Sequence, residues 1–352
     1  MNLSPVSERF AAKALQRWAT AVLMRQGVAE APATLTAKVL VRTSLRGIDT
    51  HGLARLPAYV DKLATREVNA QARPRMERRH GLLHCDGDNG LGQVVASFAL
   101  DEAMLAARTS ALVACSIRST GHLAALGGFV LSAAERGFFA ILCQRTPPVM
   151  ALPGARGPVI GNNPLAFAVP LVGRPPLVFD MAHSVVARGH VAQALREGKD
   201  AIPRDWAIGP DGTPTTDPAL ALQGAMQPIA GHKGLGLAML VECLAGSLHG
   251  FVPGEDAAAP TDLRGPAANV SAFLLVINPA LAVGQGAFDA SVSAWMQTYL
   301  EASGLGARYP GQRQAECEQQ RLRQGIPVPA GLLAELRALG RSVGRPFDLE
   351  AA

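Results

Sequence analysis

The sequence predicts a mixed α/β fold with short strands and helices alternating along the chain. Some segments carry apolar residues at helical spacing, and others are short apolar runs bounded by Gly, Pro and Asn, which is typical of strands. Apolar residues make up 49% and charged residues 17% of the 352 residues, so we expect a globular protein with a large core. A chain of this length suits about two to three domains.

The expected elements follow one another from the first residues to the last. Helices are expected over residues 6–26, 33–46, 56–63, 94–108, 123–134, 181–198, 237–248, 288–302 and 332–339. Strands are expected over 73–85 as a pair, and over 111–117, 137–144, 165–169, 177–179 and 273–277. Irregular structure is expected at 85–92, a turn-rich loop, and at 252–268, a mobile loop. Residues 310–325 are basic and Gln-rich, and their dense charge at 313–323 is expected to lie on the surface.

The stretch from Gly161 to Ala182 is the centre of the predicted fold. Its two apolar runs indicate two strands joined by a polar turn, and the first is entered through Gly-Asn-Asn-Pro, residue types that suit a backbone close to a ligand. The second strand ends on Asp180, which places a carboxylate at the exit of a rigid element. On this stretch alone, an ordinary hairpin with a capping Asp is the simpler explanation.

Composition limits the possible function classes. The net charge is +5, but Lys and Arg are dispersed, and 3 Trp, 3 Tyr and 11 Phe offer few stacking platforms, so we expect a small anionic ligand and no nucleic acid. No apolar run reaches the roughly 18 residues of a membrane span. The first residues show no secretory signal, and five scattered cysteines favour thiols in a reducing cytoplasm. His80 and His84 form a close pair without a third ligand, so no metal is expected.

The common nucleotide and nucleophile motifs are missing from the sequence. No G-x-G-x-x-G follows a predicted strand, and neither a Walker A loop nor a nucleophile-elbow Ser is present. The segment from Gly231 to Gly236 opens a helix with Lys233 in a Gly-rich entry, which is compatible with a phosphate site.

Several polar residues at turns or strand ends remain as candidates for chemistry. They are His51, Arg55, His122 and Asp180, together with Thr146 and the Lys233 loop. Reduction of a carbonyl beside a carboxylate needs a cation for the carboxylate, a His for the developing alkoxide, a carboxylate that orients this His, and a nicotinamide hydride donor. The set supplies these protein groups, although sequence alone does not establish their distances and each residue alone also fits a structural role.

Several blocks in order resemble the type-2 malate/L-lactate dehydrogenase family of oxidoreductases. Residues 46–57 (RGIDTHGLARLP) resemble the family signature RGxDSHGxxRxP. The other similar blocks are DGDNGLGQ (86–93), GNNPLAF (161–167), DMA (180–182), DGTPTTDP (211–218) and GHKGLG (231–236). The resemblance covers residues 42–250 and continues more weakly through 310–311 and 325–327. Blocks in family order are far more specific than any one motif.

The resemblance implies a non-Rossmann fold with its own large, mostly antiparallel sheet for the cofactor, and a homodimer. It divides the chain into a helical substrate and dimerisation part, residues 1–115 with 270–352, and an NAD(P)-binding part, residues 116–269. The implied activity is the interconversion of 2-oxo acids, or of cyclic 2-imino acids, with their reduced forms. NAD(P)H is the implied cofactor, with NADH against NADPH left open.

Matching positions receive the family's roles. The implied catalytic residues are His122, His51 and Asp180, and which His gives the proton stays open. The substrate residues are Thr50 and Arg55, with Arg118 and Arg156 as further positive charge. The cofactor-binding residues are Thr146, Asn163, Asp180, Met181, Ala182, His232, Lys233 and Gly234.

Three departures from the family pattern leave alternatives open. Residues 122–126 (HLAAL) are closer to the HFAAL of the imine reductase branch, His183 replaces a Thr beside the cofactor, and Gln312 replaces the Glu of a PGE motif. The main prediction from the sequence is a reductase of small 2-oxo acids. The close alternative is a cyclic ketimine reductase for pyrroline- or piperideine-2-carboxylate, and the third hypothesis is a catalytically silent cofactor-binding homologue.

Overall fold

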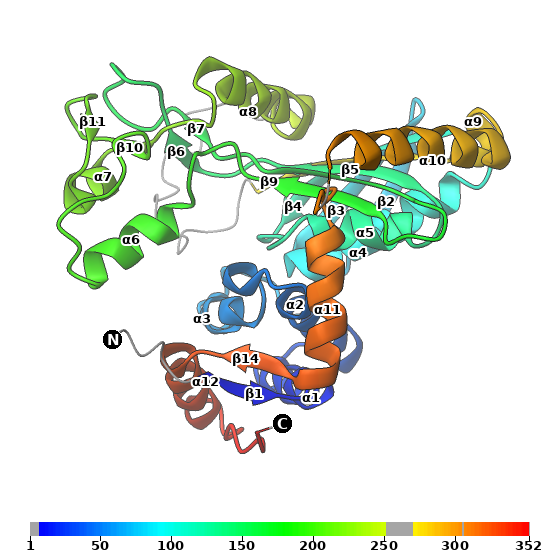
Figure 1. Ribbon diagram of the computed structural model, residues 1–352. Helices are drawn as coiled ribbons and strands as arrows, with labels where there is room; N and C mark the ends of the chain where they lie inside the picture. Colours follow the sequence, from blue (N-terminus) through cyan, green and yellow to red (C-terminus); the bar gives the residue numbers. More distant parts are fainter. Residues whose placement is uncertain (1–6, 251–269, 305, 352) are drawn as a thin grey trace.

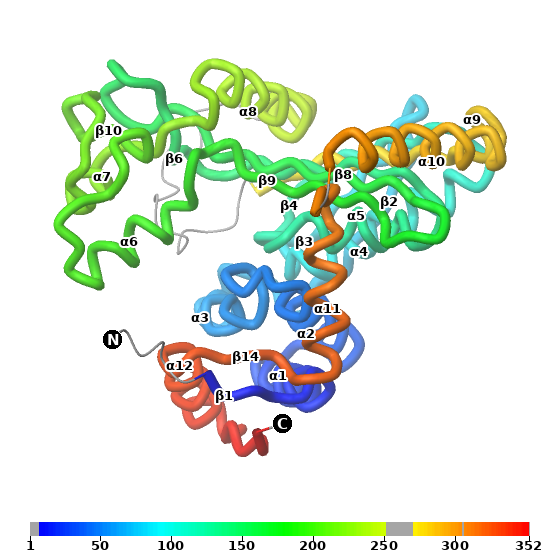
Figure 2. Tube along the Cα trace, in the orientation of Figure 1, coloured from blue at the N-terminus to red at the C-terminus, as the bar shows by residue number. Residues whose placement is uncertain are grey.

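The structure is a computed structural model that describes residues 7–250, 270–304 and 306–351. Figure 1 shows a large sheet with helices, a smaller region of short strands and helices beside one end of it, and a helical bundle below. Figure 2 shows that the bundle combines the blue N-terminal segment with the red C-terminal segment. The predicted mixed α/β class is confirmed.

The large sheet has seven strands among the described residues. In spatial order they are β2 (Arg75–Arg79), β3 (Leu82–Gly90), β4 (Leu112–Thr120), β13 (Ala272–Ile277), β5 (Phe139–Gln144), β8 (Leu165–Val169) and β9 (Leu177–Met181). Only β3 and β4 pair in parallel within this sheet, and all its other neighbouring strands are antiparallel. The mostly antiparallel sheet implied by the resemblance is therefore confirmed.

Helices cover both faces of the large sheet. They are α4 (Gly92–Ala106) and α5 (Gly127–Ala134) on one face, and α8 (His232–Ala245) and α10 (Gln285–Ala302) on the other. Successive strand residues point to opposite faces, so Leu142 and Leu274 pack with α4 and α5, whereas Cys143 and Phe273 pack with α8. None of the helices in the described ranges has the length and apolarity needed to cross a membrane.

A five-stranded sheet lies beside one end of the large sheet. Its spatial order is β11 (Pro214–Thr215), β10 (Ala207–Ile208), β12 (Ala225–Met226), β6 (Pro148–Met150) and β7 (Ile160–Gly161). The helices α6 (Arg188–Arg196) and α7 (Pro218–Gln223) flank it. The chain passes between the two sheets after β5 and after β9, so Thr146 and Asp180 lie at the crossings.

The helical bundle joins the two ends of the chain. It consists of α1 (Ala12–Arg25), α2 (Glu30–Leu45), α3 (Leu56–Ala64) and α12 (Ala330–Ser342), with the short turns η1 (Asp49–His51) and η2 (Leu53–Arg55). The strand β1 (Glu8–Phe10) pairs with β14 (Ile326–Val328), and Phe10 lies opposite Ile326. Trp18, Leu40 and Leu336 share one buried core. The remaining short helices are η3 (Ser247–His249) and α9 (Pro279–Ala282).

The helix α11 (Gln312–Gln324) connects the large sheet with the bundle. It starts after Gly311, whose φ of +95° lies in the region that favours glycine, and a Cβ there would lie 2.8 Å from the Val178 amide nitrogen. The amide of Val178 on β9 donates to the Pro310 carbonyl at 3.0 Å. Further along, Glu318 pairs with Arg46 at 2.8 Å. The helix therefore holds the start of β9 beside the segment that follows α2.

Most predicted elements are confirmed, with shifted ends in several cases. The expected loop at 85–92 was wrong in part, because β3 continues to Gly90 through a register shift, with Asp88 and Asn89 at positive φ. These turn-type residues bend the strand without ending it. The helix expected over 181–198 begins only at Arg188, and the expected surface segment 310–325 forms α11. The expected loop 252–268 lies outside the described residues.

The large sheet takes strands from both parts of the predicted division of the chain. The strands β2, β3 and β13 come from the ranges 1–115 and 270–352, and the boundary after residue 115 falls inside β4. Within residues 1–115 and 270–352, the helices α1, α2, α3 and α12 form the bundle, whereas the strands β2, β3 and β13 belong to the large sheet.

Candidate active site

A cavity of about 290 Å³ lies where the large sheet, the smaller sheet and the bundle meet. Six residues of the predicted site line it: His51, His122, Thr146, Asp180, Met181 and Ala182. The fold therefore brings together residues that are far apart in the sequence. Arg46, Gly311 and Gln314 complete the side toward α2 and α11.

The backbone around His122 is fixed by buried amide groups. The segment leaves β4 with the Gly121 amide donating to the Gly90 carbonyl at 3.0 Å. Gln93 Nε2 donates to the His122 carbonyl at 3.2 Å, and Gln144 Nε2 donates to the Gly121 carbonyl at the same distance. Because Gln93 and Gln144 are themselves buried, they hold this irregular segment in one place.

The imidazole of His122 is oriented by Tyr59 on α3. Tyr59 Oη lies 3.0 Å from His122 Nδ1, and Gln93 Nε2 donates to the same hydroxyl at 3.0 Å. Burial raises the pKa of Tyr59, so its hydroxyl stays protonated. Since Nδ1 is engaged, Nε2 is the ring nitrogen available for proton exchange with a ligand.

His51 faces His122, with 6.1 Å between the ring centroids. The Thr50 hydroxyl lies 2.9 Å from His51 Nδ1, and Arg55 Nε donates to the Thr50 carbonyl at 2.8 Å. Arg321 of α11 pairs with Asp49 and fastens the turn that carries these residues. Thr50 and Arg55 therefore support His51 from beside the cavity and do not line it.

Both histidines are neutral in the free protein at neutral pH. Burial, together with the positive charge of Arg55, lowers the pKa of His122 to about 3 and that of His51 to about 4. Arg55 thus acts electrostatically on both rings. An anion bound beside Arg55 would offset its charge and raise both pKa values.

Asp180 is the last residue but one of β9 and lines the cavity. Its Oδ2 accepts a hydrogen bond from the Gly127 amide at 2.7 Å, at the start of α5. No hydrogen bond joins it to either histidine within the described ranges, and the group bonded to His122 Nδ1 is the Tyr59 hydroxyl. Protein surrounds Asp180 on its other sides, and this loss of hydration raises the pKa of Asp180 to about 6.

Replacing Asp180 by Asn is expected to stabilise the cofactor-free protein above pH 6 and to weaken cofactor binding. The folded-state pKa of about 6 exceeds the ordinary value of 3.8, so ionisation of Asp180 lowers the free energy of unfolding as the pH rises from 4 to 6. Thermal unfolding from pH 3.5 to 8 should show matching melting temperatures for the Asp180→Asn variant and the wild type at the acid end, with the variant higher above pH 6. Equal melting temperatures throughout would contradict a destabilising carboxylate.

Thr146 and Asn163 form the framework beside Asp180. The Thr146 amide donates to Asn163 Oδ1 at 2.9 Å, and its hydroxyl donates to Asn162 Oδ1 at 2.8 Å. Asn163 is buried, and its Nδ2 donates to Glu242 Oε2 on α8 at 3.0 Å. The Asn163 side chain is therefore used inside the protein, while Asn162 lines the cavity.

His183, the residue that replaces a family Thr, lies behind this framework. It is fully buried, and its Nδ1 lies 2.6 Å from the Asn163 carbonyl oxygen. Burial lowers the pKa of His183, so the neutral ring donates this hydrogen bond. His183 thus supports the backbone of the cavity wall without entering its lining.

The other predicted site residues lie outside the cavity lining. Arg118 is exposed on β4 and pairs with Asp86 at 2.8 Å. Arg156 is exposed between β6 and β7, and His232 and Lys233 are exposed at the start of α8. Gly234 is buried, and a Cβ there would lie 2.1 Å from the Ile229 carbonyl oxygen.

Sequence reasoning missed Tyr59, Gln93, Arg46 and Gln314. Signals existed for two of them, because Arg46 opens the RGIDTHG block and Gln93 closes the DGDNGLGQ block. Tyr59 lies four residues after Arg55, on the next turn of a helix, but nothing in its spacing pointed to His122. Gln314 belongs to the segment expected to be plain surface.

The groups around the cavity fit a nicotinamide dinucleotide. Asp180 offers acceptors for ribose hydroxyls, Thr146 and Asn162 offer further polar atoms, and Val178 and Met181 give an apolar wall. Among the described residues, no three His, Cys, Asp or Glu side chains are grouped so that they would hold a metal ion.

Comparison with known proteins matches this chain to one family over most of its length. Residues 10–337 match the family described as malate/L-lactate dehydrogenase. The chain is 34% identical to a (2R)-3-sulfolactate dehydrogenase (NADP(+)) of Chromohalobacter salexigens, over 91% of this chain and 94% of that protein. It is also 34% identical to a Δ1-pyrroline-2-carboxylate reductase of Pseudomonas fluorescens, over 90% and 94%. The structure of sulfolactate dehydrogenase from Methanocaldococcus jannaschii is similar with a TM-score of 0.85 and 27% identity, covering 96% of this chain and 98% of that chain.

Proposed function

This chain belongs to the malate/L-lactate dehydrogenase family of NAD(P)-dependent oxidoreductases, and we propose that it reduces a small 2-oxo acid to the 2-hydroxy acid. The observation that carries the proposal is the setting of His122. Its ring lines the cavity, its Nδ1 is engaged by Tyr59, and His51 and Asp180 line the same space. A base or acid held this way is suited to proton exchange with an alcohol or carbonyl oxygen.

Each residue of the site has a separate role toward the bound cofactor and substrate in the proposed reaction. The reduced nicotinamide supplies the hydride when it is bound. His122 exchanges the proton through Nε2, and Tyr59 keeps the ring in position. Arg55 lies beside the cavity and not in its lining, but its positive charge acts on both histidines, and this supports a role in binding the carboxylate of a substrate placed between them. Asp180, Met181 and Ala182 line the path of the cofactor.

The low pKa of His122 sets the protonation requirement for each direction. A neutral ring is the form needed to take the proton of a hydroxy acid, whereas reduction of an oxo acid needs the protonated ring. A substrate carboxylate beside Arg55 offsets the charge that lowers the pKa of His122. Substrate binding therefore favours the protonated form that reduction consumes.

A cyclic ketimine reductase is the second candidate. The neutral state of His122 favours it, because an imine can arrive already protonated and its reduction then needs no acid. Residues 122–126 (HLAAL) and the similarity to a Δ1-pyrroline-2-carboxylate reductase point the same way. Hydride addition to a protonated imine gives the neutral amine directly, so a ring with a pKa near 3 is no obstacle.

A substrate panel separates the two candidates. We would follow oxidation of NADPH and NADH with pyruvate, oxaloacetate, other 2-oxo acids, pyrroline-2-carboxylate and piperideine-2-carboxylate. Turnover of linear 2-oxo acids is the expected result. Turnover confined to the two imines would replace the main proposal by the ketimine reductase.

The third hypothesis is a catalytically silent homologue, which His183 and Gln312 would mark as departures from the family pattern. The positions of these two residues do not favour it. His183 is buried behind the cavity wall, and Gln312 donates to Glu316 Oε1 at 3.1 Å within α11. Neither residue lines the cavity, so neither change removes a cavity group. Binding of cofactor in a titration with no turnover across the panel would favour the silent homologue.

We propose that the protein acts as a homodimer in the cytoplasm. The helix α8 carries apolar residues around its whole circumference, and Leu237, Met239 and Leu240 are 46%, 50% and 47% exposed. A helix that is apolar all round is normally buried, and a second copy of this chain would cover this face. All five cysteines lie in the described ranges without a disulfide, which suits a reducing compartment.

Replacing Leu240 by Lys is expected to convert the dimer to a monomer. A charge at the centre of an apolar contact loses its hydration without a partner, so association should weaken sharply. Light scattering after size-exclusion chromatography measures the mass directly. Leu105→Lys, at a similarly exposed Leu on α4, is the matched control and should leave the mass unchanged. A monomeric wild type would contradict the proposed dimer.

A further inference from the structure

A second cavity of about 140 Å³ adjoins the candidate active site. It lies between α2 on one side and α4 with α5 on the other. Arg46, Ile48 and Ala125 line both cavities, so the two spaces share one wall. A ligand that extends past these three residues from the first cavity reaches the second.

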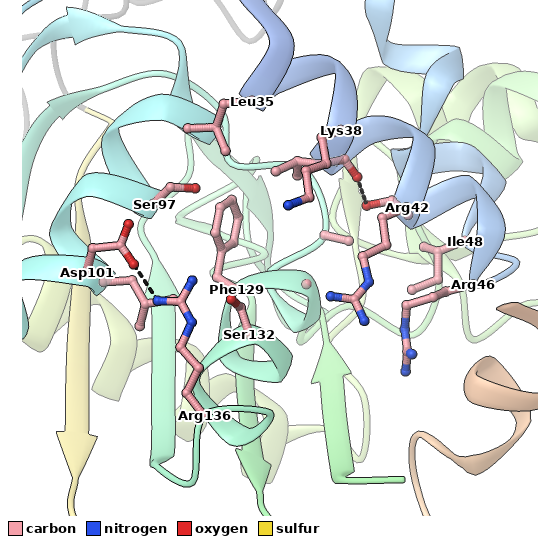
Figure 3. Close-up of a pocket in the computed structure, with 15 residues that line it drawn as sticks. Leu35, Lys38, Arg42, Arg46, Ile48, Ser97, Asp101, Phe129, Ser132 and Arg136 are labelled. Carbon is pink, nitrogen blue, oxygen red and sulfur yellow. Dashed lines mark hydrogen bonds and ion pairs between the residues drawn. The ribbon is translucent and has the colours of Figure 1, made fainter. Parts of the chain in front are cut away.

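The lining of the second cavity combines an apolar surface with basic groups. Figure 3 shows the ring of Phe129 between Lys38 and Arg42 on one side and Asp101 with Arg136 on the other. Leu35, Val39 and Leu100 add apolar surface. An apolar surface around an aromatic ring suits a flat purine base, and basic groups at its edge suit a phosphate.

The charges in this cavity leave one cation without a carboxylate partner. Arg42 donates to Glu135 and to Glu318, and Arg46 donates to the second oxygen of Glu318. Arg136 pairs with Asp101 at 2.6 Å. Within the described part of the chain, Lys38 has no such partner, and the four cations face three carboxylates. The surplus is a single positive charge on an exposed, movable side chain.

We propose that the second cavity takes the adenosine end of the cofactor and that Lys38 binds the 2′-phosphate of NADPH. This inference rests on the proposed function, because the nicotinamide end is assigned to the cavity of His122. Lys38 is then the residue that makes the enzyme prefer NADPH to NADH. The neighbouring carboxylate of Asp101 does not oppose the phosphate, because Arg136 neutralises it.

The test compares cofactor binding by the wild type and by a Lys38→Ala variant. Quenching of tryptophan fluorescence gives the Kd of NADPH and of NADH without turnover. We expect the wild type to bind NADPH more tightly, and the variant to lose roughly fivefold or more in NADPH affinity with little change for NADH. Lys13→Ala, an exposed lysine on α1, is the matched control and should keep the wild-type ratio.

A nicotinamide-free probe tests the cavity itself. Calorimetric titration with 2′,5′-ADP and with 5′-AMP should show tighter binding of 2′,5′-ADP to the wild type and the same affinity for both in Lys38→Ala. Equal binding of both probes by the wild type, or a wild type that prefers NADH, would overturn the proposal. A Lys38→Ala variant with the wild-type ratio would overturn it too. Failure of the proposed function looks different, because the substrate panel would then show no turnover of 2-oxo acids, whether or not the two probes differ in affinity.

Discussion

The His122→Asn variant is expected to lose about 10²- to 10⁴-fold in kcat with 2-oxo acids while it still binds cofactor. Asn keeps a polar side chain of similar size but exchanges no proton, so only the acid–base step is removed. Steady-state kinetics with a 2-oxo acid and a fluorescence titration with NAD(P)H measure the two effects separately. The corresponding His51→Asn variant should lose less, because the ring that Tyr59 engages through Nδ1 is that of His122.

The matched control for this variant is His80→Asn. His80 is exposed in the turn between β2 and β3 with a φ of +48°, a conformation that Asn adopts readily. Its kinetics should equal those of the wild type. If His51→Asn abolished turnover while His122→Asn kept most of it, the proton-transfer role would belong to His51. If both lost imine turnover as strongly as oxo-acid turnover, the change would lie in binding and not in acid catalysis.

The second large effect is expected from Gly92→Ala, at the first residue of α4. A Cβ at Gly92 would lie 2.4 Å from the His122 carbonyl oxygen and 2.6 Å from that of Gly121. Both are backbone atoms, so the segment that carries His122 must move. We expect a loss of about 1–3 kcal/mol in the free energy of unfolding. We also expect kcat to fall under conditions in which the variant is still fully folded, because His122 is displaced. Urea unfolding and kinetics on the same preparation measure both.

Gly331→Ala is the matched control on α12. A Cβ at Gly331 has no atom within 4 Å in the described structure, so stability and turnover should stay at the wild-type level or rise slightly. A Gly92→Ala variant with wild-type stability and wild-type kcat would contradict the close packing of α4 against the His122 segment.

Most helices and strands could be predicted from the sequence, because each has a local pattern of apolar residues. The short apolar runs at 273–277 and 137–144 predicted two strands, and the structure pairs Leu274 with Leu142 in one sheet. The sheet order was not readable, because β13 lies between β4 and β5 although more than a hundred residues separate it from them in the chain. That order depends on burying both faces of β13, a property of the assembled fold and not of its sequence pattern.

Site residues at turns or strand ends could be predicted from the sequence, whereas those that act through contacts between distant elements could not. His51, His122 and Asp180 all end or follow rigid elements, and all three line the cavity. Tyr59 reaches His122 only because α3 packs beside the end of β4, so its role has no local signature. Lys233 differs from these residues. Its Gly-rich context predicted a ligand contact, but the structure places it exposed at the start of α8, outside the cavity lining.

The most direct test of the proposed reaction is transfer of deuterium from reduced cofactor that carries deuterium at both C4 positions of the nicotinamide. The wild type would be mixed with this cofactor and, in parallel reactions, with a 2-oxo acid or with pyrroline-2-carboxylate, and the products examined by mass spectrometry and NMR. The account predicts one deuterium on carbon 2 of the 2-hydroxy acid and oxidised cofactor in equal amount. A 2-oxo acid recovered unchanged while pyrroline-2-carboxylate gains the deuterium would contradict the main proposal, as would cofactor oxidation without label in any product.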